Sequence, residues 1–273
     1  MNHPMESKDL IKNLETAILA SVDAGKAIMK VYESSDFETV HKKDDSPLTK
    51  ADKDANEVIL SYLKKTQMPI ISEENKTIDY QVRKNWELCW MVDPLDGTKE
   101  FIKKNGEFTV NIALISKGEP ILGVIYAPVT KELYFANVKE RASYKIIVDK
   151  IEELPENLFS SKNQISAMNV TNNVMRVVGS RSHMNDKTEE FIRDLEKEQI
   201  EVSVVSKGSS FKFCLVAEGK ADVYPRFAPT MEWDTAAGHA ICKALGYKVE
   251  NWETKNELTY NKENLLNPFF LVH

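Results

Sequence analysis

The chain has 273 residues, of which 42% are hydrophobic and 29% charged, and its formal net charge is −6, from 36 Lys and Arg against 42 Asp and Glu. This length predicts one large domain or two closely joined halves, and the composition excludes disordered, collagen-like and low-complexity proteins. The acidic balance provides no electrostatic basis for binding a nucleic-acid polymer.

Two amphipathic helices are predicted at the start of the chain. Apolar residues recur every three or four positions between Lys8 and Glu33, which indicates one helix of the scaffold. A second helix is expected after a polar stretch, with Thr49 as its N-cap and Asp52 at its third position.

Strands dominate the middle of the chain. Pro69 to Ile71 and Leu88 to Val92 are expected to be buried strands with carboxylates at their C-terminal ends. An antiparallel meander is predicted from alternating segments at 108–116, 120–127, 131–137 and 144–148. The second half changes to an α/β rhythm, with strands at 174–179, 201–205 and 221–224 and helices near 186–198, after Ser210 and after Asp234. We therefore divide the chain into an N-terminal α+β half (1–150) and a C-terminal α/β half (151–273), with the polar stretch 151–172 as the boundary.

The cysteines and the apolar runs bear on cellular location. Cys89, Cys214 and Cys242 are far apart, lie in or beside apolar stretches, and show neither a CxxC pair nor zinc-ligand spacing. We expect three buried, reduced thiols, as in a cytoplasmic protein. No apolar run approaches the roughly 18 residues of a membrane-spanning helix, and the N-terminus shows no signal-peptide pattern.

The most informative motif is Asp93-Pro94-Leu95-Asp96-Gly97-Thr98. The strand is expected to end at Asp93, because Pro94 cannot continue the ladder, and a turn would then bring Asp93 and Asp96 together with the Leu95 carbonyl between them. Gly97 permits close backbone approach, and Thr98 is expected to cap a short helix through Lys103 whose free N–H groups face an anion. Carboxylates for Mg²⁺ beside amides for phosphate suit metal-assisted phosphoryl chemistry. The alternative, a surface turn with capping residues, leaves the buried strand unexplained.

Three other carboxylates are ambiguous when taken singly. Glu73 is then an exposed charge at a strand end, Asp234 an ordinary N-cap and Asp52 a member of a capping box. If Glu73, Asp93, Asp96 and Asp234 converge, however, the cluster cannot stay ionised without bound cations. The joint hypothesis therefore predicts a metal site.

Four segments in this order resemble the inositol monophosphatase superfamily of Mg²⁺-dependent, lithium-sensitive phosphatases: Leu48 to Asp52, Ser72 to Glu74, Asp93 to Phe101 and Trp233 to Ala240. The 3'(2'),5'-bisphosphate nucleotidases of the CysQ type are similar within it at Lys99 to Phe101, Asn105 to Phe108, Gly208 to Lys212 and Tyr224 to Arg226. The likeness covers nearly the whole chain. It implies a layered α/β/α/β/α sandwich of the inositol monophosphatase and fructose-1,6-bisphosphatase type, with the metal site at the junction of the two halves.

The resemblance also implies roles for individual residues. Two or three Mg²⁺ ions, with lithium as an inhibitor, would be bound by Glu73, Asp93, the Leu95 carbonyl, Asp96 and Asp234. Asp52 and Thr98 would orient and deprotonate the attacking water, with Glu73 as a third catalytic residue. Substrate would be contacted by Asp96, Gly97, Thr98 and Asp234, and its nucleotide part by His183, Ser209, Lys212 and Arg226.

The activity implied is hydrolysis of the 3'-phosphate of adenosine 3',5'-bisphosphate to AMP and phosphate, in sulfur assimilation or nucleotide recycling. The sulfated nucleotide, 3'-phosphoadenosine 5'-phosphosulfate, is a second candidate substrate, and attachment to the cytoplasmic face of the inner membrane is left open. Hydrolysis of inositol monophosphate or fructose bisphosphate would use the same carboxylates but would not need Lys212 and Arg226 as nucleotide clamps. A nucleotide sensor without turnover would have no use for the pair Asp52 and Thr98.

Overall fold

The computed structural model describes residues 6–33, 39–41, 47–75, 78–148, 155–166, 174–179 and 184–273, with the backbone alone at 39–41 and 47–49. The helices are α1 (Ser7–Tyr32), α2 (Lys50–Leu63), α3 (Tyr80–Arg83), α4 (Thr98–Ile102), α5 (Asp186–Lys197), α6 (Phe211–Ala217) and α7 (Glu232–Ala244). The strands are β1 (Thr39–His41), β2 (Pro47–Thr49), β3 (Ile70–Ser72), β4 (Leu88–Asp96), β5 (Thr109–Ser116), β6 (Glu119–Ala127), β7 (Glu132–Asn137), β8 (Ala142–Ile147), β9 (Val174–Gly179), β10 (Glu201–Ser206), β11 (Tyr224–Arg226), β12 (Val249–Asn251) and β13 (Phe270–Val272).

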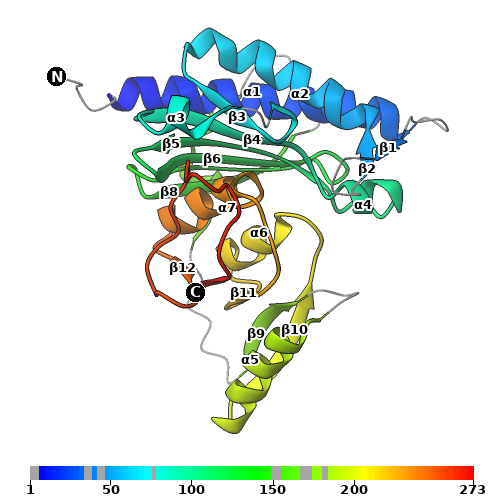
Figure 1. The fold of residues 1–273 in the computed structure, drawn as a ribbon, viewed down its shortest axis with the longest axis vertical. Helices are drawn as coiled ribbons and strands as arrows, with labels where there is room; N and C mark the ends of the chain where they lie inside the picture. The colour runs from blue at the N-terminus through cyan, green and yellow to red at the C-terminus, as the bar shows by residue number, and fades with distance from the viewer. Residues whose placement is uncertain are drawn as a thin grey trace.

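The centre of the fold is a six-stranded sheet of order β3-β4-β5-β6-β7-β8. Strands β3 and β4 run parallel, and β4 to β8 form the predicted antiparallel meander. Helices α1 and α2 cover one face, and α6 and α7 lie on the other (Figure 1). Alternate β4 residues serve the two faces: Trp90 and Val92 belong to the core with α1 and α2, and Cys89 and Met91 to the core with α6 and α7. Burial on both faces explains why this strand is a continuous apolar run.

The close approach of α7 to the sheet depends on a glycine. A Cβ at Gly123 of β6 would overlap the carbonyl oxygen of Ala237 and the Cβ of Ala240. With no side chain there, the helix lies directly against the strand. This contact places the N-terminal turn of α7 at the edge of the sheet where β4 ends.

The second half adds two smaller sheets beyond α6 and α7. Strands β9 and β10 pair in parallel with α5 beside them, and β11, β13 and β12 form an antiparallel sheet (Figure 1). The alternating helix and sheet layers confirm the predicted fold class. The strand expected at 221–224 lies later, at Tyr224–Arg226, because at Val223 the chain makes only an isolated bridge to Val177 of β9.

Part of the predicted boundary stretch packs on the N-terminal half. Gln164 forms an isolated bridge with Tyr144 of β8, and the Phe159 ring lies 5.8 Å from that of Tyr144. Residues 151–154 and 167–172 lie outside the described residues. All three cysteines are free and buried, as predicted. Among the described residues, no helix has the length and apolar character needed to cross a membrane.

Candidate active site

The predicted metal carboxylates begin at the ends of two parallel strands. Ser72 of β3 pairs with Val92 of β4, so Glu73 and Asp93, the next residues along each strand, emerge at the same edge. Asp93 is only 1% exposed. Two acidic side chains are thus brought together by strand pairing alone.

The strand does not end at Asp93, as the sequence analysis expected, but continues through Pro94 to Asp96. Asp93 lies opposite Asn111 of β5 and Asp96 opposite Thr109, so β4 carries one extra residue here. Proline is tolerated because the extra residue forms a β-bulge. Since Asn111 and Thr109 are two residues apart, they share one face of the sheet, and the bulge turns Asp96 to the face that Asp93 already shares with Asn111.

The turn after the bulge also differs in detail from the prediction. Gly97, not Thr98, is the N-cap of α4, and its φ of 95° is a left-handed conformation that favours glycine. Thr98 is the first helical residue, and its hydroxyl donates to the Leu95 carbonyl at 3.4 Å. The helix ends at Ile102, one residue before the predicted Lys103.

Two further carboxylates come from helix N-termini in the two halves. Asp234 is the third residue of α7, which begins at Glu232, and its Oδ2 accepts a hydrogen bond from the Met231 backbone N–H at 2.8 Å. It is therefore not the N-cap that its place in the sequence suggested. Asp52 is the third residue of α2, as predicted, and is completely buried.

These carboxylates lie close enough to one another to interact electrostatically. The pKa of Asp93 is raised well above its usual value by burial first and then by the charges of Glu73, Asp96, Asp234 and Asp52. Burial and the charge of Asp96 likewise raise the pKa of Asp234 to about 8. A cluster of this kind favours bound cations, since like charges in a buried site repel each other.

Carboxylate oxygens and a main-chain carbonyl are the ligands that Mg²⁺ prefers. The donor set predicted for the metal therefore fits this ion in chemistry. The side chains do not form a closed ligand shell: within the described ranges, no three His, Cys, Asp or Glu side chains are gathered as a ready-made metal site.

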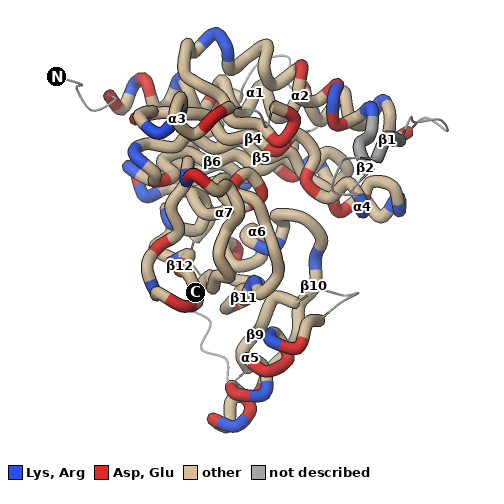
Figure 2. The backbone as a smooth tube through the Cα atoms, viewed as in Figure 1, with Lys and Arg blue, Asp and Glu red and all other residues tan. Residues whose placement is uncertain are grey.

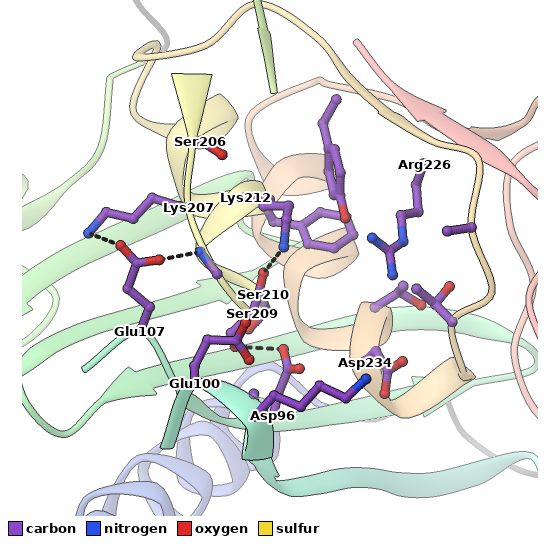
Figure 3. Close-up of a pocket in the computed structure, with 18 of the residues that line it drawn as sticks. Asp96, Glu100, Glu107, Ser206, Lys207, Ser209, Ser210, Lys212, Arg226 and Asp234 are labelled. Carbon is purple, nitrogen blue, oxygen red and sulfur yellow. Dashed lines mark hydrogen bonds and ion pairs between the residues drawn. The ribbon is translucent and has the colours of Figure 1, made fainter. Parts of the chain in front are cut away.

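A cavity of about 450 Å³ opens beside Asp96 and Asp234. It lies between the segment around α4 and residues 206–213, with β11 and the start of α7 completing the wall. Asp96 and Asp234 lie at one end, and Lys212 and Arg226 approach from the other (Figure 3). The charged side chains that line it are Asp96, Lys99, Glu100, Lys103, Glu107, Lys207, Lys212, Arg226 and Asp234. Elsewhere the acidic and basic residues are dispersed over the chain (Figure 2).

Lys212 and Arg226 form a cationic pair in this cavity. Burial and the neighbouring charge of Arg226 lower the pKa of Lys212 to about 8. Lys212 Nζ donates to the Ser209 carbonyl at 3.0 Å, and an Arg226 terminal nitrogen to the Pro229 carbonyl at 3.3 Å. The buried Nε of Arg226 has no hydrogen-bond partner among the described residues. Two adjacent cations with unused donors can bind an anion.

The other predicted nucleotide contacts are placed unevenly. Ser209 lines the cavity, but its hydroxyl donates to Asp96 Oδ2 at 2.7 Å. His183 lies outside the described residues.

Glu107, Thr109 and Asn111 were missed as candidates, although each supports the site. Glu107 Oε2 accepts from the Gly208 backbone N–H at 2.8 Å, and Asn111 donates to Asp96 Oδ2 at 3.3 Å. Strand alternation puts Thr109 and Asn111 on one face, but only the bulge in β4 reveals that this is the face of the carboxylates.

Comparison with known proteins gives consistent matches over nearly the whole chain. The model of the inositol monophosphatase family matches residues 9–268. Proteins named 3'(2'),5'-bisphosphate nucleotidase CysQ from Salmonella typhimurium and Escherichia coli K12 are each 46% identical to this chain, over 95% and 92% of it and 98% and 95% of their own lengths. The crystal structure of CysQ from Bacteroides thetaiotaomicron, described as a bacterial member of the inositol monophosphatase family, is 50% identical, covers 96% of both chains and has a TM-score of 0.86. The layered α/β sandwich is thus shared with this family.

Proposed function

Because the chain belongs to the inositol monophosphatase family, we propose that it is a metal-dependent 3'(2'),5'-bisphosphate nucleotidase. The proposed reaction is hydrolysis of the 3'-phosphate of adenosine 3',5'-bisphosphate to AMP and phosphate. The observation that carries the proposal is the single cavity that joins the carboxylates Asp96 and Asp234 to the cations Lys212 and Arg226. The reacting phosphate of a substrate can be held at the carboxylate end of this cavity, and a second phosphate of the same substrate at the cationic end.

Magnesium, when bound, supplies Lewis-acid stabilisation of the phosphoryl oxygens and a water of lowered pKa. We assign its ligands as Glu73, Asp93, Asp96, Asp234 and the Leu95 carbonyl. Four of these are acidic side chains, two on β4, one just after β3 and one in the first turn of α7, and the charges of the other three raise the pKa of Asp93.

The chain's own residues position the remaining reactants. Gly97, the N-cap of α4, lines the cavity, and its backbone N–H with that of Thr98 would bind the reacting phosphate. The Thr98 hydroxyl and the buried Asp52 carboxylate, with Glu73, would orient the attacking water and accept its proton.

The second phosphate would be bound by Lys212 and Arg226. An arginine with a buried, unpartnered Nε can form two parallel hydrogen bonds to a phosphate. The volume of about 450 Å³ falls within the range of small-ligand pockets, roughly 300 to 1,000 Å³. The sulfated nucleotide, whose 5'-group is also anionic, is the second substrate that we propose.

Two rival functions make different demands on the site. Hydrolysis of inositol monophosphate or fructose bisphosphate would leave Lys212 and Arg226 without the nucleotide role proposed here. A nucleotide sensor would use Lys212 and Arg226 to bind the nucleotide but would not need Asp52 and Thr98. The presence of both groups favours a nucleotidase.

The test is phosphate release from a panel comprising adenosine 3',5'-bisphosphate, its sulfated analogue, 3'-AMP, inositol 1-phosphate and fructose 1,6-bisphosphate. We expect the bisphosphate to have the highest kcat/KM and all turnover to stop in excess chelator. Asp96→Asn should abolish turnover while the protein stays folded. A preference for inositol 1-phosphate, or full activity in chelator, would contradict the proposal.

A further inference from the structure

A buried hydrogen-bond network leads from strand β5 to the carboxylate of Asp96. The Thr109 hydroxyl lies 2.5 Å from that of Ser209, which in turn lies 2.7 Å from Asp96 Oδ2. Ser210 Oγ lies 2.6 Å from Asn111 Oδ1 and 2.7 Å from Thr109 Oγ1. Thr109, Asn111 and Ser210 are at most 3% exposed. The link between Ser209 and Asp96 is drawn in Figure 3.

The direction of these hydrogen bonds follows from which groups can donate. An ionised carboxylate only accepts, so Ser209 donates to Asp96 and can only accept from Thr109. The single Thr109 proton has a second acceptor in reach, Asn111 Oδ1 at 3.1 Å. Asn111 accepts from Ser210 through its Oδ1, which leaves its Nδ2 to donate to Asp96 Oδ2 at 3.3 Å. Oδ2 of Asp96 therefore receives two donors, one from each half of the chain.

The backbone around Ser209 is fixed on both sides. Ser209 has a φ of 51°, a left-handed conformation that is uncommon for serine and persists where the surroundings hold it. Gly208 before it donates to Glu107 Oε2 at 2.8 Å, and a Cβ at Gly208 would lie 2.8 Å from the Glu107 carbonyl oxygen. These contacts place the Ser209 hydroxyl within hydrogen-bond distance of Asp96.

We infer that Thr109 and Asn111 are positioning residues that orient Asp96 for metal binding. Asn111 hydrogen-bonds Oδ2 directly and Thr109 acts on it through Ser209, which would leave the other oxygen, Oδ1, for the cation. This inference rests on the proposed metal-dependent function. Partners of this kind behind a metal ligand commonly change metal affinity by about 10- to 100-fold when they are removed.

The test compares two substitutions of one residue. Thr109→Val keeps the branched shape on a buried strand but removes the hydroxyl, whereas Thr109→Ser keeps the hydroxyl and removes the methyl group. We expect Thr109→Val to weaken Mg²⁺ binding about 10-fold, measured by calorimetry without substrate and by the Mg²⁺-induced rise in Tm. Thr109→Ser should bind Mg²⁺ much as the unmodified protein does.

Activity provides a second readout. Thr109→Val should need more Mg²⁺ for half-maximal turnover, recover kcat at saturating Mg²⁺ and keep its KM for the nucleotide. The matched control is Thr66→Val. The Thr66 hydroxyl, like that of Thr109, has several hydrogen-bond partners: it donates to the Leu63 carbonyl at 2.6 Å and accepts from Trp90 Nε1 at 2.9 Å and from the Met68 backbone N–H at 3.4 Å, at the far end of α2 from Asp52. That variant should lose stability without changing Mg²⁺ affinity.

Two results would overturn the inference: equal Mg²⁺ affinity in Thr109→Val and the unmodified protein, or equal losses in the Val and Ser variants. The second would mean that packing, not the hydroxyl, matters at this position. Failure of the proposed function is distinguishable, because it would appear as absent Mg²⁺-dependent nucleotidase activity in the unmodified protein.

Discussion

Glu232, the first residue of α7, is completely buried and accepts a hydrogen bond from the backbone N–H of Asn261 at 2.5 Å. Its other oxygen accepts from the Lys262 backbone N–H at 3.1 Å and also contacts the Lys262 ammonium. One carboxylate thus ties the start of α7 to the loop after β12. Asp234, two residues later, is held in place by the same anchor.

Removal of this carboxylate should affect both stability and activity. We expect Glu232→Ala to lower the free energy of unfolding by about 2–3 kcal/mol, because two backbone donors lose their buried acceptor. Activity should also fall, since the first turn of α7 carries Asp234. Urea unfolding and kcat/KM measure the two effects, with the exposed Glu253→Ala as the control. Equal unfolding curves would show that the loop is held by other contacts.

A second charged network should shape stability in acid. Lys145 Nζ lies 2.9 Å from Glu218 Oε2, and the Tyr134 hydroxyl donates to Glu218 Oε1 at 2.7 Å. Burial raises the pKa of Glu218, but hydrogen bonds from Lys220, Tyr134 and Lys145 outweigh it, and the pKa lies below its ordinary value. This network joins the end of α6 to β7 and β8.

A lowered carboxylate pKa contributes stability above its unfolded value, about 4.3, that is lost as the pH falls through the folded value. Glu218→Gln should therefore lower the free energy of unfolding at pH 7 and weaken its dependence on pH below about 4. Thermal unfolding between pH 3 and 7 provides the measurement, with the exposed Glu190→Gln as control. Parallel pH profiles for Glu218→Gln and the unmodified protein would count against the network.

The helices and strands were predicted well from the sequence where the spacing of apolar residues is regular. The backbone path through Asp93 to Thr98 was predicted poorly, because it depends on strand pairing. The meander and the long helices follow from apolar spacing, and carboxylates follow both buried strands as expected, but the parallel pairing of β3 with β4 was not predicted. The bulge that turns Asp96 to the same face was not predictable, because proline normally argues against a continuing strand. The support from Thr109 and Asn111 depends on that bulge, so it was equally hidden.

Asp52 distinguishes a catalytic role from a capping role. If it acts on the attacking water, Asp52→Asn should lower kcat and kcat/KM together by orders of magnitude, with nucleotide binding nearly unchanged. Stability should change little, because Asn keeps the size and shape of Asp at this third helical position. The metal-free variant should even gain some stability, since the charge of Asp52 contributes to the raised pKa of Asp93. Steady-state kinetics test the loss of turnover, and thermal unfolding in chelator tests the gain in stability. Near-normal turnover would leave Asp52 with a structural role at the start of α2 only.

The protonation of Lys212 should limit nucleotide recognition at alkaline pH. Burial and Arg226 lower its pKa to about 8, and a lysine is charged only below its pKa. For adenosine 3',5'-bisphosphate, kcat/KM should therefore fall as the pH rises through about 8, which gives the pH profile an alkaline limb. The kcat/KM for 3'-AMP should show no such limb. Arg226→Gln removes a neighbouring positive charge, so the limb should move to higher pH. A limb that is identical for both substrates would assign it to a different group.

Arg226 separates nucleotide chemistry from sugar-phosphate chemistry. A 5'-phosphate is remote from the 3'-ester, so a cation that binds it contributes binding energy that orients the reacting group. Loss of a charge-assisted contact typically costs about 1.5–3 kcal/mol, so Arg226→Ala should lower kcat/KM for adenosine 3',5'-bisphosphate by roughly 10- to 150-fold. The loss on 3'-AMP, which lacks the second phosphate, should be slight. Arg226→Lys is the matched control, because it keeps the charge but not the planar guanidinium group. Its kcat/KM for adenosine 3',5'-bisphosphate should lie between those of the unmodified protein and Arg226→Ala. Equal losses on both substrates would place Arg226 at the reacting phosphate or in folding, and would contradict its assignment to the second phosphate.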